Sequence, residues 1–264
     1  MQIASHAHSG NMPLKNPLQR EGLAVIDSTP PAFASEVAKF LDPPALAKAW
    51  SFLPYGLIIV NNTGRYLWGF TVVYTLPDRI SLAGTPWQYQ ISRTAMGGAD
   101  RRFMLAPGGS YLVTPVSDFT IAREPDGRRS PQPLLDEGLD RVIQIFEVQD
   151  SKERFEASID SVIYEDGTLV GPDSAHRMDK LNAQIRAQKD LSALSTLHGD
   201  ELRKELLLHS GLGAADEYSR HKSRVSKSLV EGLDRRGEAE TLNILDKFRM
   251  AWFANADTVR RRQQ

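Results

Sequence analysis

The chain has 264 residues, of which 41% are hydrophobic and 25% charged, so it suits one large globular domain or two modest ones. The absence of cysteine excludes disulfides, thiolate metal sites and thiol catalysis. The net charge of −1 combines an acidic stretch 1–173, with 15 Lys and Arg against 20 Asp and Glu, and a basic stretch 174–264, with 17 against 13. Two separately solvated surfaces account for this modest asymmetry.

The N-terminal segment 1–20 is polar, and we expect it to be flexible. His6 and His8 have the spacing of a metal-binding pair but no third ligand nearby, so we expect no metal and no cofactor. No charged segment followed by an apolar core marks a signal peptide, and no apolar run reaches the roughly 18 residues of a membrane span. The sequence therefore favours a cytoplasmic protein by default, without a transmembrane segment.

Residues 21–173 are expected to form a β-domain with short helical insertions. Leu23–Ile26 predicts an edge strand, and the apolar spacing from 33 to 50 predicts two short helical turns interrupted at Pro43 and Pro44. Leu57–Val60 is a continuous apolar run bounded by turn residues, which is typical of a strand buried on both faces.

Residues 66–76 alternate so that Trp68, Phe70 and Tyr74 share one face of a strand. Such a row of aromatics can stack on sugars or bases, but in a sheet protein it more often forms the core. We therefore predict that Trp68 is buried. The stretch 117–140 is rich in turn residues and predicts a long exposed loop, in which Arg128 and Arg129 are candidate partner-binding residues.

The stretch 141–173 predicts two long strands, a tight turn and a short return strand. Residues 154–163 alternate, with Ile159 on the core face and Asp160 facing water. Asp166-Gly167 then predicts a two-residue hairpin turn with positive φ at both positions. After Asp173 the hydrophobic period changes from two to about 3.6, so the C-terminal region 174–264 should be almost wholly helical.

Four helices are expected in that region, with Asp200 as the cap of the second. The last carries an apolar stripe that must bury its face on its own chain or on another one. We regard its members as candidate partner-binding residues: Leu242, Leu245, Phe248 and Trp252.

The fold class predicted from these patterns is α+β, an antiparallel β-sandwich followed by a C-terminal α-helical region. The sandwich resembles the immunoglobulin fold in architecture, without the disulfide of that family. This resemblance assigns no function. The leading hypothesis is a non-enzymatic binding or structural module that mediates protein–protein interaction or self-association as a homo-oligomer.

Two alternatives stay open. A carbohydrate-active or other hydrolase would need a carboxylate pair from Asp160, Glu165, Asp166 and Asp173, but alternation places the first two on opposite strand faces, while a turn and a helix cap explain the others. Association with nucleic acid would need a continuous basic face on the helices, which acidic residues interrupt between 231 and 240. We therefore predict no catalytic residue and disfavour nucleic acid as a partner.

Overall fold

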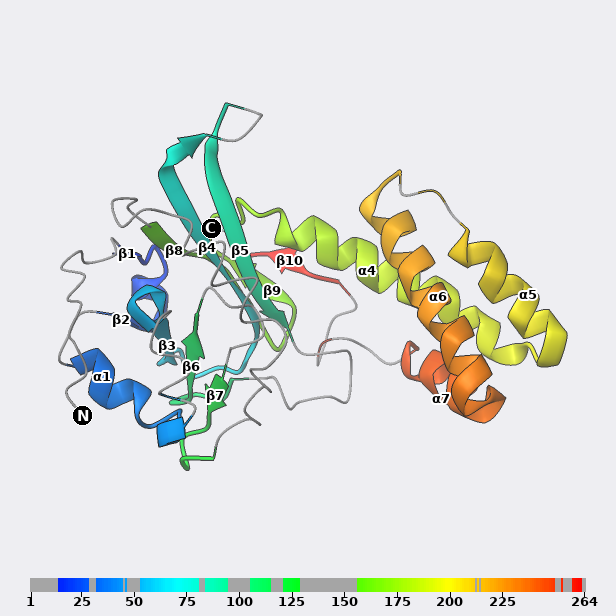
Figure 1. Ribbon diagram of the computed structural model, residues 1–264, viewed down its shortest axis with the longest axis horizontal. Coiled ribbons are helices and arrows are strands. Elements are labelled where there is room, and N and C mark those ends of the chain that lie inside the picture. Colours follow the sequence, from blue (N-terminus) through cyan, green and yellow to red (C-terminus); the bar gives the residue numbers. More distant parts are fainter. Residues whose placement is uncertain are drawn as a thin grey trace. The chain divides into compact units, whose positions relative to one another are not determined.

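A computed structural model describes residues 14–28, 32–44, 46, 53–80, 84–94, 105–114, 121–128, 156–211, 213, 215–249, 253 and 258–262. The fold is α+β, with two sheets in which most strand pairs are antiparallel and a helical C-terminal region (Figure 1). Neither sheet closes into a barrel over these residues. The chain divides into two compact units, the first formed by 1–94 with 102–162 and the second by 95–101 with 163–264.

The larger sheet has the strand order β10-β9-β8-β4-β5, and β1 pairs with β8. Its strands are β1 (Leu14–Lys15), β4 (Leu67–Ile80), β5 (Pro86–Thr94), β8 (Glu156–Tyr164), β9 (Thr168–Val170) and β10 (Arg260–Arg261). Two of its pairs, β1 with β8 and β10 with β9, are parallel. The prediction of antiparallel pairing is therefore wrong for these two pairs.

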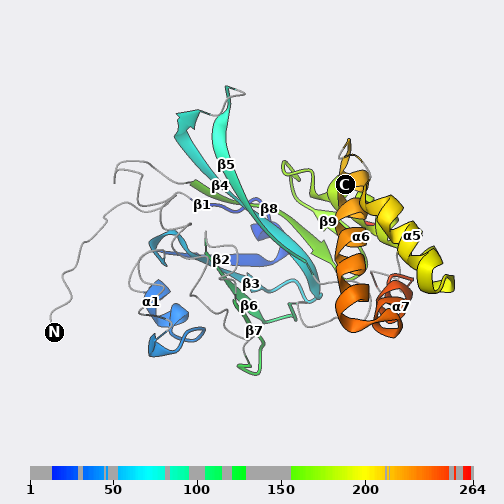
Figure 2. The same ribbon diagram turned by 45° about the vertical axis from the view of Figure 1, so that its right-hand side comes forward.

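The smaller sheet is antiparallel and has the order β2-β3-β6-β7 (Figure 2). Its strands are β2 (Leu23–Asp27), β3 (Leu57–Asn61), β6 (Ser110–Val113) and β7 (Ile121–Arg123). The edge position of β2 confirms the prediction for that run. Because β7 lies inside the stretch 117–140, the prediction of an uninterrupted loop there is wrong.

The core of the first unit is built around β4, both faces of which are buried. Trp68 is 2% exposed and Tyr74 is fully buried, so the prediction of a buried aromatic row is confirmed. The ring of Phe70 lies 5.0 Å from that of Tyr111 on β6, which brings a β4 side chain of the larger sheet against the smaller one. A stacking platform would need these rings in solvent, and they are not.

β8 forms where the alternating pattern predicted it, with Ala157 and Ile159 fully buried. Asp160, however, is only 2% exposed, and Ser161 beside it is also buried. The prediction that Asp160 faces water is wrong because the second face of the strand is covered as well.

The turn after β8 contains Glu165, Asp166 and Gly167. Gly167 has φ +80° and donates its N–H to the carbonyl of Tyr164 (2.9 Å), whereas Asp166 does not have a positive φ. Asp166 Oδ1 instead accepts from the N–H of Thr168 (2.9 Å). The connection is a three-residue loop with a left-handed glycine, so the position of the turn is confirmed and its two-residue type is wrong.

Short helical segments accompany the sheets in the first unit: η1 (Gln19–Glu21), α1 (Ala32–Val37) and η2 (Leu53–Tyr55). Phe33, Val37 and Phe40 pack in one cluster with Ile58 of β3 and Leu112 of β6. The predicted helical turn before Pro43 therefore covers part of the smaller sheet.

Four helices and a short 3-10 turn follow β9: α4 (Arg177–Ser192), η4 (Ala193–Thr196), α5 (Gly199–Ser210), α6 (Glu217–Arg236) and α7 (Glu238–Lys247). Asp216 caps α6 by accepting from the N–H of Ser219 (2.7 Å). The predicted cap Asp200 lies inside the first turn of α5. That helix is instead capped by Glu238 of α7, whose carboxylate accepts from the N–H of Gly199 (3.0 Å).

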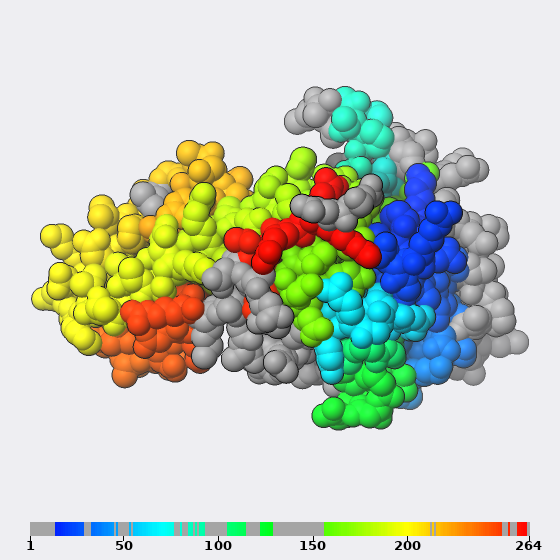
Figure 3. All heavy atoms as spheres, turned by 180° about the vertical axis from the view of Figure 1, so that it is seen from behind, coloured from blue at the N-terminus to red at the C-terminus, as the bar shows by residue number. Residues whose placement is uncertain are grey.

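The chain then returns to the sheet as β10, so the region after Asp173 is not wholly helical. Figure 3 shows these C-terminal residues as a band beside the residues of β9 and the start of α4. The N–H of Arg260 donates to Gly167 O (2.9 Å) and that of Arg262 to Leu169 O (3.0 Å). Asn182 of α4 holds Val259 through both of its backbone groups, at 2.7 and 3.0 Å.

Candidate functional site

The outer edge of β2 is the first candidate site. Gly22 and Asn62 lie opposite one another at the start of the β2–β3 pair, and the N–H of Asn62 donates to Gly22 O (2.9 Å). Residues in an antiparallel pair alternate between pointing both backbone groups at the partner and pointing them away. Ala24 and Ile26 therefore direct their N–H and C=O toward β3, and Val25 directs its own toward the free edge.

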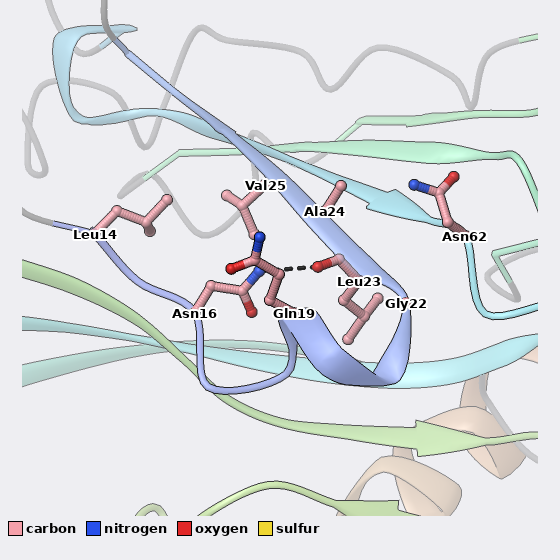
Figure 4. Close-up of a pocket in the computed structure, with 8 residues that line it drawn as sticks. All are labelled: Leu14, Asn16, Gln19, Gly22, Leu23, Ala24, Val25 and Asn62. Carbon is pink, nitrogen blue, oxygen red and sulfur yellow. Dashed lines mark hydrogen bonds between the residues drawn. The ribbon is translucent and has the colours of Figure 1, made fainter.

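The segment before β2 closes one end of this edge. Leu23 N donates to Leu18 O (3.4 Å), and Leu23 O accepts from the side-chain amide of Asn16 (2.9 Å; Figure 4). The side chain of Asn16 thus donates to the Leu23 carbonyl the hydrogen bond that a neighbouring strand would donate. No residue in the part of the chain that the structure describes makes a hydrogen bond to the outward backbone groups of Val25.

A pocket of about 390 Å³ lies beside this edge. The described residues that line it are Leu14, Asn16, Gln19, Gly22, Leu23, Ala24, Val25 and Asn62 (Figure 4). None of these side chains is ionisable. The carboxamides of Gln19 and Asn62 are bonded to no described residue, so both keep a free donor and a free acceptor.

The wall of the pocket at Gly22 requires glycine. Its φ is +88°, which other residues adopt only at a cost, and its N–H donates to Gln19 O (3.1 Å). A Cβ at this position would lie 3.0 Å from Asn62 O and 3.1 Å from Thr63 Cα. A side chain at this position would therefore be strained by the positive φ and tightly packed against the loop after β3.

That loop is fixed by the buried side chain of Asn61. Its amide donates to the carbonyls of Arg65 (2.8 Å) and Leu105 (3.0 Å), and its Oδ1 accepts from the N–H (3.1 Å) and hydroxyl (2.7 Å) of Thr63. A fully buried carboxamide with all its groups bonded rigidly positions the chain around it. Asn62, the next residue, is thereby held at the pocket.

The second unit encloses most of the apolar stripe that was proposed for a partner. Leu245 is fully buried, in a cluster with four leucines: Leu191, Leu202, Leu206 and Leu229. Leu242 and Phe248 pack partly buried against this cluster, and Trp252 lies outside the described residues. Among the described residues of this unit, the large apolar side chains that are exposed are Leu207 (48%) and Leu208 (63%) of α5.

Arg128 lies in the turn that follows β7 and is exposed. Its guanidinium Nε donates to Asp126 Oδ2 (2.6 Å), and its N–H donates to Asp126 Oδ1 (3.0 Å). The hydrogen bond from the Arg128 backbone is the main reason that the pKa of Asp126 is lowered. The side chain of Arg128 is thus already paired with an acidic neighbour. Arg129 lies outside the described residues.

The interface of α4 and α6 carries a polar network. Tyr218 donates its hydroxyl to Asp190 and accepts from Lys222 Nζ (3.1 Å), while the guanidinium of Arg186 lies over its ring at 4.6 Å. These groups bond to one another, so the network joins the two helices.

His221 lies one turn further along the same interface, between Gln188 of α4 (3.4 Å) and Arg224 (3.0 Å). Burial and the Arg224 charge lower the pKa of His221 to about 4. The ring is therefore neutral at physiological pH and accepts from Arg224.

Two of the carboxylates considered for hydrolysis have structural roles. Asp166 is used in its turn, and Asp173 accepts from the N–H groups of Arg177 (2.6 Å) and Met178 (3.3 Å) at the start of α4. The described residues contain no group of three or more His, Asp or Glu side chains with the geometry of a metal site. No helix among them is long and apolar enough to cross a membrane.

Sequence analysis predicted the β2 strand and its edge position, but not the pocket. The pocket depends on which backbone groups of β2 face outward, and only the pairing with β3 determines that. Gly22 followed by an apolar run was the one local signal. The chain matches no protein-family model, no curated protein and no solved structure.

Proposed function

We propose that the protein is a non-catalytic binding module that takes an extended segment of a partner protein at the free edge of β2. The observation that carries this proposal is the unpaired N–H and C=O of Val25 beside a pocket of about 390 Å³. Addition of a strand to an exposed sheet edge is a common mode of peptide recognition, in which backbone hydrogen bonds give affinity and adjacent pockets give specificity.

The composition of β2 supports this use of its edge. Natural sheets protect free edges with lysine, proline, bulges or a covering segment. Residues 23–27 contain no lysine and no proline, and their register with β3 runs without a bulge. Within the described residues, the segment before β2 closes this edge at Leu23, through Leu18 O and the side chain of Asn16, and leaves the outward groups of Val25 available.

The fold proposed for the first unit is an immunoglobulin-like sandwich. Three features support it: the contact of Phe70 with Tyr111 between sheets, the burial of both faces of β4, and the antiparallel order of the smaller sheet. In such an architecture the sheet edges and the loops at the ends are the parts free to meet a partner.

Strand addition is tested by replacing Val25 with proline. Proline removes the outward N–H, while the bonds that join β2 to β3 come from Ala24 and Ile26 and stay in place. Random seven-residue peptides displayed on phage and selected on the full chain should bind the wild type and Val25→Ala, and lose at least tenfold in affinity for Val25→Pro. Selected peptides that bind all three proteins equally would refute the proposal.

Self-association through the second unit is a second candidate, which the exposure of Leu207 and Leu208 on one helix favours. The partner would be a second copy of the chain. The mass in solution of the wild type should then exceed that of a folded Leu207→Ser, Leu208→Ser double variant. A monomeric wild type would eliminate this candidate and leave strand addition unaffected.

A further inference from the structure

We propose that the segment bound at β2 is uncharged where it meets the pocket and anchors there one large side chain with an apolar body and a neutral polar tip, as tyrosine has. The inference rests on the proposed strand addition and specifies which partner sequence the site takes. It follows from the chemistry of the lining, the size of the pocket and the position of the free backbone groups.

The described lining disfavours a charged anchor. Leu14, Ala24 and Val25 supply apolar surface, and the polar groups are carboxamides without formal charge. An ammonium or carboxylate moved into this pocket would lose its hydration without gaining an opposite charge. A neutral side chain avoids this cost.

The two free carboxamides favour a polar tip on the anchor. Gln19 and Asn62 line the same pocket and are bonded to no described residue, so each offers a donor and an acceptor to a ligand. A phenol hydroxyl both donates and accepts, and its ring fills apolar space. A wholly apolar anchor would fill that space but leave both carboxamides without a hydrogen-bond partner.

Size and register limit the site to one anchor. A volume of about 390 Å³ is near the lower end of the roughly 300–1,000 Å³ that small-molecule pockets occupy, so one bulky side chain fits better than several. Because Asn16 already bonds Leu23 O, the bound strand can pair with β2 no earlier than Val25. The residue that pairs with Val25, or one next to it, therefore carries the anchor.

The test uses acetylated seven-residue peptides of alternating threonine and valine whose central residue is tyrosine, phenylalanine, alanine, lysine or glutamate. Binding to the full chain is measured by titration of amide chemical shifts. The tyrosine peptide should bind at least tenfold more tightly than the alanine, lysine and glutamate peptides. The Gln19→Ala, Asn62→Ala double variant should reduce its advantage over phenylalanine, and Gln88→Ala, an exposed carboxamide on β5, should not.

The outcomes separate the two proposals. Loss of all binding in Val25→Pro together with equal affinity for every central residue would overturn the anchor and retain strand addition. A preference for tyrosine that persists in Val25→Pro would retain the anchor and overturn strand addition. If none of the peptides binds the wild type, both proposals are overturned.

Discussion

Two strand edges in this protein differ in how their outward backbone groups are bonded. At β9 the C-terminal strand β10 covers the edge with its own backbone, and Asn182 holds both backbone groups of Val259. At β2 the side chain of Asn16 satisfies the carbonyl of Leu23, and the outward groups of Val25 bond to no residue that the structure describes. An asparagine takes part at each edge, but only β9 gains a covering strand.

The proposed function gives each edge a different role. A covered edge stabilises the fold and offers no template to another chain. An edge that is closed at one residue and open at the next limits the register of an incoming strand, because pairing can start no earlier than the open residue. We therefore regard β9 as a structural edge and β2 as a binding edge.

The largest expected effect is on stability, and it should differ between proline substitutions on the two sides of β2. Ala24→Pro removes an N–H that faces β3 and should lower the free energy of unfolding by about 2–4 kcal/mol. Val25→Pro removes an N–H that faces outward and should cost less than about 1 kcal/mol. Urea unfolding of the two variants measures the difference, and equal losses would mean that the alternation along β2 is assigned wrongly.

At the covered edge, Gly167 should tolerate no side chain. Its φ is +80°, and a Cβ would lie 2.7 Å from Thr258 O, in the segment that leads into β10. Gly167→Ala should cost about 2–3 kcal/mol. Gly64→Ala is the matched control, because its φ of +72° carries the same backbone cost in open space. Thermal unfolding should show the smaller loss for Gly64→Ala, and equal losses would contradict the close approach.

Removing the clamp at Val259 should have an intermediate effect. Asn182→Ala leaves the N–H and C=O of Val259 without their partners, which should cost about 2 kcal/mol. The exposed Asn243 of α7 provides the control, since Asn243→Ala should change stability by less than about 0.5 kcal/mol. If both variants unfold at the same denaturant concentration, Asn182 does not hold β10.

The last effect concerns pH and the second unit. The pKa of His221 is lowered to about 4 by burial and by Arg224, so between about pH 4 and 6.5 the folded protein binds fewer protons than the unfolded chain. Stability should therefore decrease as the pH falls through this range, by up to about 3 kcal/mol.

His221→Gln removes this titration and retains a group that can accept from Arg224. It should flatten the pH dependence of the free energy of unfolding between pH 6.5 and 4. His198→Gln is the control, because that ring is exposed and pairs with Glu238 at the surface. An unchanged pH profile in His221→Gln would show that another group is responsible.

The elements that the sequence predicted correctly share a hydrophobic pattern that repeats over many residues. The strands around Trp68 and Ile159 and the four C-terminal helices each repeat their pattern often enough to specify one structure. Helix ends were less predictable, since Glu238 caps α5 from another helix and no local motif reveals it.

The elements that were missed depend on distant partners. β1, β7 and β10 have two or three residues each and become strands because a neighbour pairs with them. The burial of Asp160 depends likewise on what covers the second face of β8. The candidate site belongs to the same class, because the free groups of Val25 follow from the register with β3 and have no sequence motif of their own.

Amide hydrogen exchange tests the contrast between the two edges most directly. In the free protein the amide of Val25 should exchange at close to the rate of an unprotected peptide, while those of Ala24 and Ile26 are protected. The amides of Val259 and Arg260 should be protected as well, because both donate within the covered edge. Protection of Val25 equal to that of Ala24 would show that the edge of β2 is already covered and would contradict the account.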